Sequence, residues 1–208
     1  EGFLTGGFNT ELNSNLPGAE DFLTYDPEEV KNYELGFKGQ LMDGNVNLMA
    51  SVFHMDYSNQ QEQVRIADPD DIFGIDADID LVQNVASSTI SGVELELRAS
   101  LWEGGFVSVD WSKLSNEFED YSYPDVDNPG EFIDLSDFQI FDYTPETSLN
   151  FAVDHQFQLG GGATLTPRLS AYWQSDLDFG LNGNPQPNGA PDTSCMQDSY
   201  TKFNGRLT

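Results

Sequence analysis

The sequence predicts an all-β fold: an antiparallel up-and-down meander of about eight strands, forming an open curved sheet of the transmembrane β-barrel type. Three observations predict this fold. Apolar side chains recur at every second position over much of the chain, which is the period of a strand with two unlike faces. Tight turns alternate with long polar connections, and charged side chains occupy mid-strand positions opposite the apolar ones. These features are typical of a membrane barrel with short turns at one end and long loops at the other.

The alternation defines the strands in order along the chain. From Tyr33 to Leu41, odd positions are apolar or glycine and even positions are polar or glycine. The pattern resumes at Val46 and blurs between Phe53 and Tyr57, where we expect a membrane interface or a β-bulge. Further strands are predicted around residues 93–98, 107–111, 149–159, 165–174 and 200–208.

Two residues on the apolar faces of these strands are unusual there, namely His155 and Pro167. A proline cannot donate a ladder hydrogen bond, so we expect irregular pairing at Pro167.

The connections have two lengths. Tight turns are predicted at residues 43–44, 103–105 and 160–162, all of which contain glycine. Long polar segments lie near residues 10–28, 63–82, 117–143 and 178–198. The alternation of short and long connections matches the periplasmic turns and extracellular loops of an outer-membrane barrel. A soluble up-and-down barrel has no reason to show this asymmetry.

The two faces of the strands differ in chemistry. Charges of both signs suit a polar lumen, and the apolar side then faces lipid. Trp102 beside a tight turn, and Tyr57, Tyr143 and Trp173 towards the long loops, fit the aromatic girdles found at membrane interfaces. The set expected on the convex, lipid-facing side is Leu35, Phe37, Leu48, Val93, Leu95, Val109, Phe151 and Leu169. The mid-strand charges opposite the apolar face are Glu34, Lys38, Glu94, Glu96, Arg98, Asp154 and Arg168. Of these, the set expected on the concave side is Glu34, Glu94, Glu96, Asp154 and Arg168.

Composition limits the classes of partner. With 36 acidic residues against 8 basic ones, the formal net charge is −28, which disfavours nucleic acid as a partner. No apolar run approaches the roughly 18 residues that a spanning helix needs. Cys195 is the single cysteine, so it is free or pairs with a residue outside these 208. The opening residues do not resemble a signal peptide, so an exported parent is expected to begin further upstream.

Five segments of the chain carry motifs of a known family. Tyr25–Lys38 has the pattern "PE…nYElGlK" and Gly6-Gly7-Phe8-Asn9 has the pattern "GGFN"; they resemble two strands of the TonB-dependent outer-membrane receptors. Residues 45–61, 84–97 and 200–207 resemble three further strands, although Gly205 stands where alanine is usual. The order and spacing of the five matches cover nearly the whole chain.

The resemblance implies a function. Family members import nutrients across the Gram-negative outer membrane through a 22-stranded barrel with an N-terminal plug, energised by TonB. The GGFN form favours receptors for iron complexes such as siderophores. Residues 1–208 are therefore expected to be a fragment of the barrel domain, with the plug and the other strands absent. The implied partners are outer-membrane lipid, an iron complex and, through the plug, TonB.

No enzyme site is expected. His54 and His155 are far apart in sequence, and no nucleophile elbow, phosphate loop or zinc spacing is present. The segment Asp76–Asp80 begins like a calcium loop, but Leu81 and Ser87 stand where an EF-hand needs glycine and glutamate. We therefore predict no catalytic, cofactor-binding or metal-binding residue and no cofactor.

The long loops leave their roles open. Residues 117–142 hold nine acidic residues and no lysine or arginine; they form either a field that attracts cations or an acidic surface suited to a salty habitat, and the second is favoured. Such a field would repel anionic iron complexes. Aromatic residues there line a ligand pocket or pack the loops together, and no ligand-binding residue is singled out. They are Tyr121, Tyr123, Phe138, Phe141 and Phe179.

The sequence leaves three alternatives to an iron-transport receptor. A TonB-dependent receptor for a glycan or a cobalamin shares every barrel feature. A small non-energised barrel or adhesion module would lack the plug. A soluble acidic β-sandwich is disfavoured by the loop asymmetry and by the aromatic placement.

Overall fold

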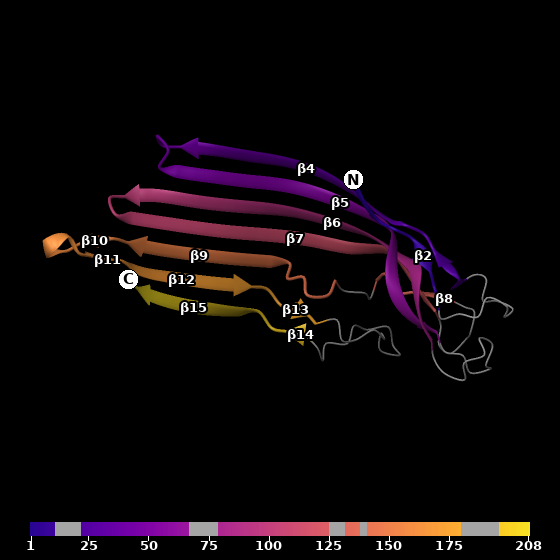
Figure 1. Ribbon diagram of the computed structural model, residues 1–208. Coiled ribbons are helices and arrows are strands. Elements are labelled where there is room, and N and C mark those ends of the chain that lie inside the picture. Colours follow the sequence, from indigo (N-terminus) through magenta and orange to yellow (C-terminus); the bar gives the residue numbers. More distant parts are fainter. Residues whose placement is uncertain (11–21, 67–78, 125–131, 138–140, 180–195) are drawn as a thin grey trace.

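The computed structural model describes residues 1–10, 22–66, 79–124, 132–137, 141–179 and 196–208. The principal feature is one antiparallel curved sheet with neighbour order β1-β4-β5-β6-β7-β9-β12-β15 (Figure 1). Its strands are β1 (Gly2–Leu4), β4 (Glu28–Leu41), β5 (Val46–Ile66), β6 (Ile79–Trp102), β7 (Gly105–Pro124), β9 (Thr147–His155), β12 (Pro167–Gln174) and β15 (Tyr200–Leu207). The predicted open antiparallel meander is confirmed.

Shorter strands extend the sheet at its two ends. β8 (Phe132–Asp134) pairs with the far end of β7. The other short strands form three ladders, which are β2 (Gly7–Phe8) with β3 (Thr24–Tyr25), β10 (Phe157–Gln158) with β11 (Thr164–Leu165), and β13 (Leu177–Asp178) with β14 (Met196–Gln197). A 3-10 turn, Gly160–Gly162, joins β10 to β11. Within the described residues, no helix is long and apolar enough to span a membrane.

The three predicted tight turns lie at one end of the sheet, here called the turn end (Figure 1). Left-handed backbone angles are found in each of them: φ is 88° at Gly44, 75° at Gly104 and 77° at Gly161. A β-carbon at Gly104 would also lie only 2.8 Å from the carbonyl oxygen of Gln156. The glycines are therefore required by the turns, which set the register of the strands they join.

The register separates the two predicted faces. Phe37, Leu95, Trp111, Leu149 and Trp173 occupy one row across five strands. The neighbouring position on each strand points to the other face, where the next row contains Lys38, Glu96, Asp110, Asn150 and Tyr172. Every residue of the two predicted sets lies on the expected side of this division.

The apolar face is open rather than covered. Leu35 is 76% exposed and Leu169 is 65% exposed, far more than side chains in a water-soluble core. At the turn end, the Trp102 indole donates a hydrogen bond to Nδ1 of His155 (3.0 Å), and the ring of Phe157 lies edge-on to that imidazole. This amphipathic aromatic group is what an interfacial girdle requires.

Of the two predicted irregularities, one is displaced and one is present. Residues 53–57 pair with β6 in unbroken register, and the bulge lies just beyond them: the register shifts between Tyr57 and Gln61, and Asn59 has φ of 55°. The β9–β12 ladder begins only at Arg168 opposite Asp154, and the chain leaves the strand conformation just before Pro167.

One prediction was wrong in part: the long polar segments are not all loop. β5 runs to residue 66, β6 starts at residue 79 and β7 runs to residue 124, each well inside a segment expected to be loop. Beyond the bulge these three strands curl away from the barrel wall (Figure 1). Local alternation is lost there because the bulge and the curl change which side of each strand is buried.

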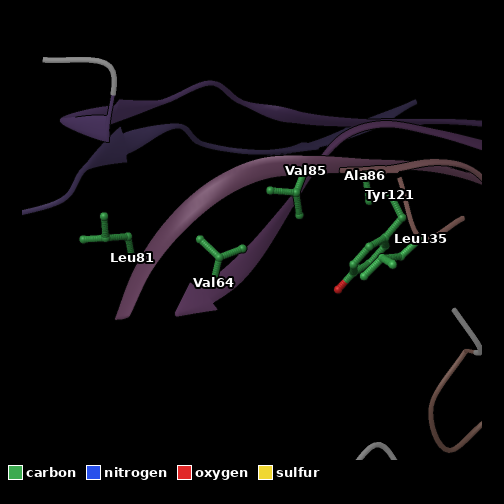
Figure 2. Packing of buried hydrophobic residues seen from close by; sticks show 6 residues of the cluster. All are labelled: Val64, Leu81, Val85, Ala86, Tyr121 and Leu135. Carbon is green, nitrogen blue, oxygen red and sulfur yellow. The ribbon is translucent and has the colours of Figure 1, made fainter. Parts of the chain in front are cut away.

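The curled strand ends carry the largest group of buried apolar residues described. Figure 2 shows the six residues, which are Val64, Leu81, Val85, Ala86, Tyr121 and Leu135. Phe22, Leu23 and Phe118 pack against them. We call this unit the loop-end lobe; it comprises the curled ends of β5, β6 and β7, the β2–β3 ladder, β8 and Leu135. It is a small water-excluded core outside the barrel wall.

Candidate functional site

The polar face encloses a hollow of about 470 Å³. Its lining includes Glu34, Glu94 and Glu96 of the predicted concave set, and also Phe37 and Leu95 of the predicted convex set. Most of the lining residues belong to the polar face, so the hollow indicates that the polar face is the concave side of the sheet, as predicted. In a closed barrel this face lines the lumen.

Two ion pairs organise the charges on the concave face. Arg98 lies 2.6 Å from Asp110, and Arg168 lies 2.7 Å from Asp154. Each pair joins neighbouring strands, which favours the observed register. Because the side chains are only partly buried, each pair is worth about 1 kcal/mol or less.

A bent antiparallel arm leads from the barrel wall to the loop-end lobe. Its wall part is β1 paired with β4, and its outer part is β2 paired with β3. The pairing is interrupted where Gly6 approaches the backbone of Tyr25 and Asp26. A β-carbon at Gly6 would lie 2.4 Å from the Tyr25 carbonyl oxygen, so only glycine permits this approach. Gly7 is similarly close to the Tyr25 ring.

Two side-chain amides from β5 and β6 fix the bend of this arm. Gln61 and Asn84 lie opposite each other in the register, and both donate to the carbonyl oxygen of Asp26, at 2.9 and 3.0 Å. The Asp26 backbone N–H donates in return to Oδ1 of Asn84 at 2.6 Å. Gln61 also donates to the carbonyl of Thr5, so both chains of the arm are bound.

Asn9 attaches the outer part of the arm to β6. Its amide nitrogen donates to the carbonyls of Phe22 and Val82, each at 2.8 Å, and its amide oxygen accepts from the Val82 N–H at 3.0 Å. The Asn9 backbone N–H donates to Leu23. The side chain thus makes with Val82 the pair of bonds that a neighbouring strand would make.

Carboxylates gather at the same end of the sheet. Burial, and the nearby charges of Asp142 and Glu28, raise the pKa of Glu62. Burial and the charge of Asp178 raise the pKa of Asp142. Asp134 differs, because hydrogen bonds from Ser136 lower its pKa. The described residues of the loop end therefore include a group of neighbouring carboxylates, Glu28, Glu62, Asp142 and Asp178.

The aromatic residues singled out in the loops pack with other aromatic rings where they are described. Phe118 stacks on Phe141 with centroids 4.3 Å apart and meets Tyr121 edge-on at 5.2 Å. Phe179 meets Tyr143 edge-on at 5.9 Å. Phe138 and the side chain of Tyr123 lie outside the described residues.

One hydrogen-bonded chain has the composition of a hydrolase triad. His54 Nδ1 lies 2.8 Å from the Ser91 hydroxyl, and His54 Nε2 lies 2.7 Å from Asp56. All three lie on the convex face, and the backbone groups of Ser91 belong to paired strands. Acyl transfer needs a pocket and free N–H groups aimed at an oxyanion. The hollow described above opens on the opposite, concave face, so we assign this chain no catalytic role.

Metal-ligating groups and the cysteine do not contribute to a site within the described residues. No group of three or more histidine, cysteine or acidic side chains suited to a metal ion occurs among the described residues. Cys195 and residues 76–78 of the calcium-like segment lie outside them. The residues that sequence reasoning missed are Asn9, Gln61 and Asn84. Their positions fall inside the family-like segments, but their contacts join residues up to 73 positions apart.

Comparisons with known proteins agree with this architecture. Residues 2–208 match the sequence model of the family described as TonB dependent receptor-like, beta-barrel. A curated relative is the probable TonB-dependent siderophore receptor PiuA of Acinetobacter baumannii, 27% identical over 92 residues, covering 44% of this chain and 11% of that protein.

Solved structures share the fold. The ferric yersiniabactin uptake receptor FyuA from Yersinia pestis superposes with a TM-score of 0.63 at 18% identity, over 99% of this chain and 26% of that one. The ferric preacinetobactin receptor BauA from Acinetobacter baumannii gives 0.59 at 15% identity, over 99% and 25%. The chain thus spans about a quarter of the length of these receptors.

Proposed function

Because the chain belongs to the TonB-dependent receptor β-barrel family, we propose that its parent binds an iron complex at the cell surface and imports it with energy supplied through TonB. The barrel lies in the outer membrane of a Gram-negative bacterium, with its apolar face against lipid. The match over residues 2–208 carries the proposal. The names of the relatives support iron: PiuA is a probable siderophore receptor, FyuA is a ferric yersiniabactin uptake receptor, and BauA is a ferric preacinetobactin receptor.

We propose further that residues 1–208 are part of one barrel domain, completed by more strands and by a plug in the parent. Two features support this. The sheet is open, with β1 and β15 at its edges, and unpaired strand edges are unfavourable in lipid. The chain also covers only 26% and 25% of the two ferric receptors.

The charge of the loop end bears on the ligand. The acidic group around Glu62 and Asp142 repels anions and attracts cations over distances of about a Debye length. A neutral or cationic iron complex therefore fits this entrance better than a citrate or catecholate complex of negative charge.

The test is uptake of radiolabelled iron complexes by cells with and without the full gene, each with and without TonB. The proposal expects uptake that requires both. Uptake that persists without TonB would contradict an energised receptor. Unchanged iron uptake, together with lost growth on a glycan or a cobalamin, would replace iron with another nutrient while keeping the receptor.

A further inference from the structure

The strand pairing of the barrel wall stops before the loop-end lobe begins. The β4–β5 ladder ends at Glu29 opposite Ser58, and the bulge at Asn59 follows. Beyond it, the backbone of residues 22–28 has no β5 neighbour in register. Asp26 is exposed at this point, so hydrogen bonds from protein side chains, in place of bonds to water, fix the course of the arm there.

Side-chain amides supply those bonds at two levels. At the bend, Gln61 and Asn84 satisfy the Asp26 peptide group from both sides. Further out, Asn9 takes the place of a strand beside Val82. An amide suits both positions because it offers a donor and an acceptor in one plane, as a peptide group does.

The two sets of contacts have one consequence for packing. Phe22 and Leu23 immediately precede β3, and they pack on the buried group around Leu81 and Val64. Those side chains reach that core because the arm bends towards the curled ends of β5 and β6. Asn9 binds the carbonyl of Phe22 directly, so the polar contacts and the apolar contacts depend on the same arrangement of the chain.

We propose that Asn9, Gln61 and Asn84 are positioning residues: they fix the β2–β3 arm against the curled β5–β6 ends in the ligand-free receptor, and so hold the ligand-facing end in one arrangement. The second half of this statement rests on the proposed function; the first half does not. The lobe is then preorganised, and ligand binding does not have to order it.

The experiment uses the intact receptor and two measurements. The first is amide hydrogen exchange without ligand. The variants are Asn9→Ala, which removes donor and acceptor, and Asn9→Asp, which keeps the acceptor for Val82 but loses the donor. The matched control is Asn47→Ala, an exposed asparagine lower on β5. The second measurement is the affinity for ferric complexes, tested on the same preparations.

The proposal expects Asn9→Ala to speed exchange in residues 2–9 and 22–28 by roughly tenfold to a hundredfold, with Asn9→Asp intermediate. Exchange in β9 and β12 and the amount of receptor in the outer membrane should stay unchanged, as they should for Asn47→Ala. Affinity for the ferric complex should fall with the loss of protection, and Gln61→Ala should act in the same way.

Each contrary result is decisive. Unchanged exchange in the arm, or a uniform rise over the whole barrel, would overturn the positioning role. Faster exchange with unchanged affinity would overturn its connection to the ligand. A wild-type receptor that binds no ferric complex would count against the proposed function, and the ligand-free exchange data would still decide the first half of this proposal.

Discussion

Arginine substituted in turn at two adjacent positions of one strand, one on each face, tests which face of the sheet contacts lipid. Phe151 and Asn150 are neighbours on β9, on the convex and concave sides. Phe151 is two residues from Leu149, which pairs with Trp173, and four from His155 in the turn-end girdle. At about 3.3 Å per residue, Phe151 lies about 7 Å from the level of Trp173 and about 13 Å from the level of His155, and therefore within the lipid between these two levels.

The magnitudes follow from these positions. Arginine at mid-depth on a lipid-facing strand costs about 2–4 kcal/mol, so Phe151→Arg should shift the unfolding equilibrium roughly thirtyfold to several hundredfold. In Asn150→Arg the guanidinium enters the concave side, next to Asp110, whose carboxylate already accepts a hydrogen bond from Asn150 at 3.3 Å. That variant should change stability by less than about 1 kcal/mol.

Urea unfolding of the intact receptor in phospholipid vesicles, followed by tryptophan fluorescence, measures both variants against wild type. Equal losses for Phe151→Arg and Asn150→Arg, or a larger loss for Asn150→Arg, would refute the assignment of faces. Phe151→Leu is a second control. It keeps an apolar side chain towards lipid, so it should lower the free energy of unfolding far less than Phe151→Arg does.

Three other perturbations test the packing and the charge. Leu81→Ala should cost the loop-end lobe about 2–5 kcal/mol, seen as protease cleavage confined to the lobe, because Leu81 is 1% exposed. Gly92→Ala should lower the urea midpoint, by about 1–3 kcal/mol, because its β-carbon would lie 2.4 Å from the Phe53 ring, whereas Gly36→Ala, with 3.7 Å to its nearest neighbour, should not. The raised pKa of Glu62 means that the folded lobe binds its proton more tightly than the unfolded chain. The protection factors of the lobe amides, which are exchange rates corrected for the intrinsic rise with pH, should therefore fall as pH rises above the usual glutamate range, and Glu62→Gln should weaken that fall.

The barrel wall could be predicted from the sequence because its rules are local. Alternation with a period of two assigns Phe37 and Lys38 to opposite faces without knowledge of their neighbours. Glycines between two alternating segments indicate tight turns, and Gly44 and Gly104 do have the positive φ that such turns need. The loss of alternation up to Tyr57 also indicated an irregularity, and the bulge lies just after that residue. Each of these features depends on residues only a few positions apart.

The loop-end lobe could not be predicted in this way because its rules are not local. Val64 and Leu81 are buried, yet each lies in a polar segment where alternation does not identify it as core. Asn9 belongs to a motif that was informative only as a family resemblance, since its partner Val82 is 73 positions away. A side-chain amide that imitates a strand leaves no periodic signal in the sequence.

The contrast between the two parts of the chain has a physical origin in their surroundings. In lipid, apolar side chains gain nothing by turning inward, so the wall keeps Leu35 and Leu169 exposed and derives its order from closed backbone pairing. Above the membrane, water restores the hydrophobic effect, and the same strands gather Val64, Leu81 and Leu135 into a core. The change occurs within a few residues of the bulge at Asn59, where β5 leaves the wall. The bulge and the amide contacts beside it therefore lie where stabilisation by backbone pairing in lipid gives way to stabilisation by hydrophobic burial in water. A substitution there should disturb the lobe long before it disturbs the barrel.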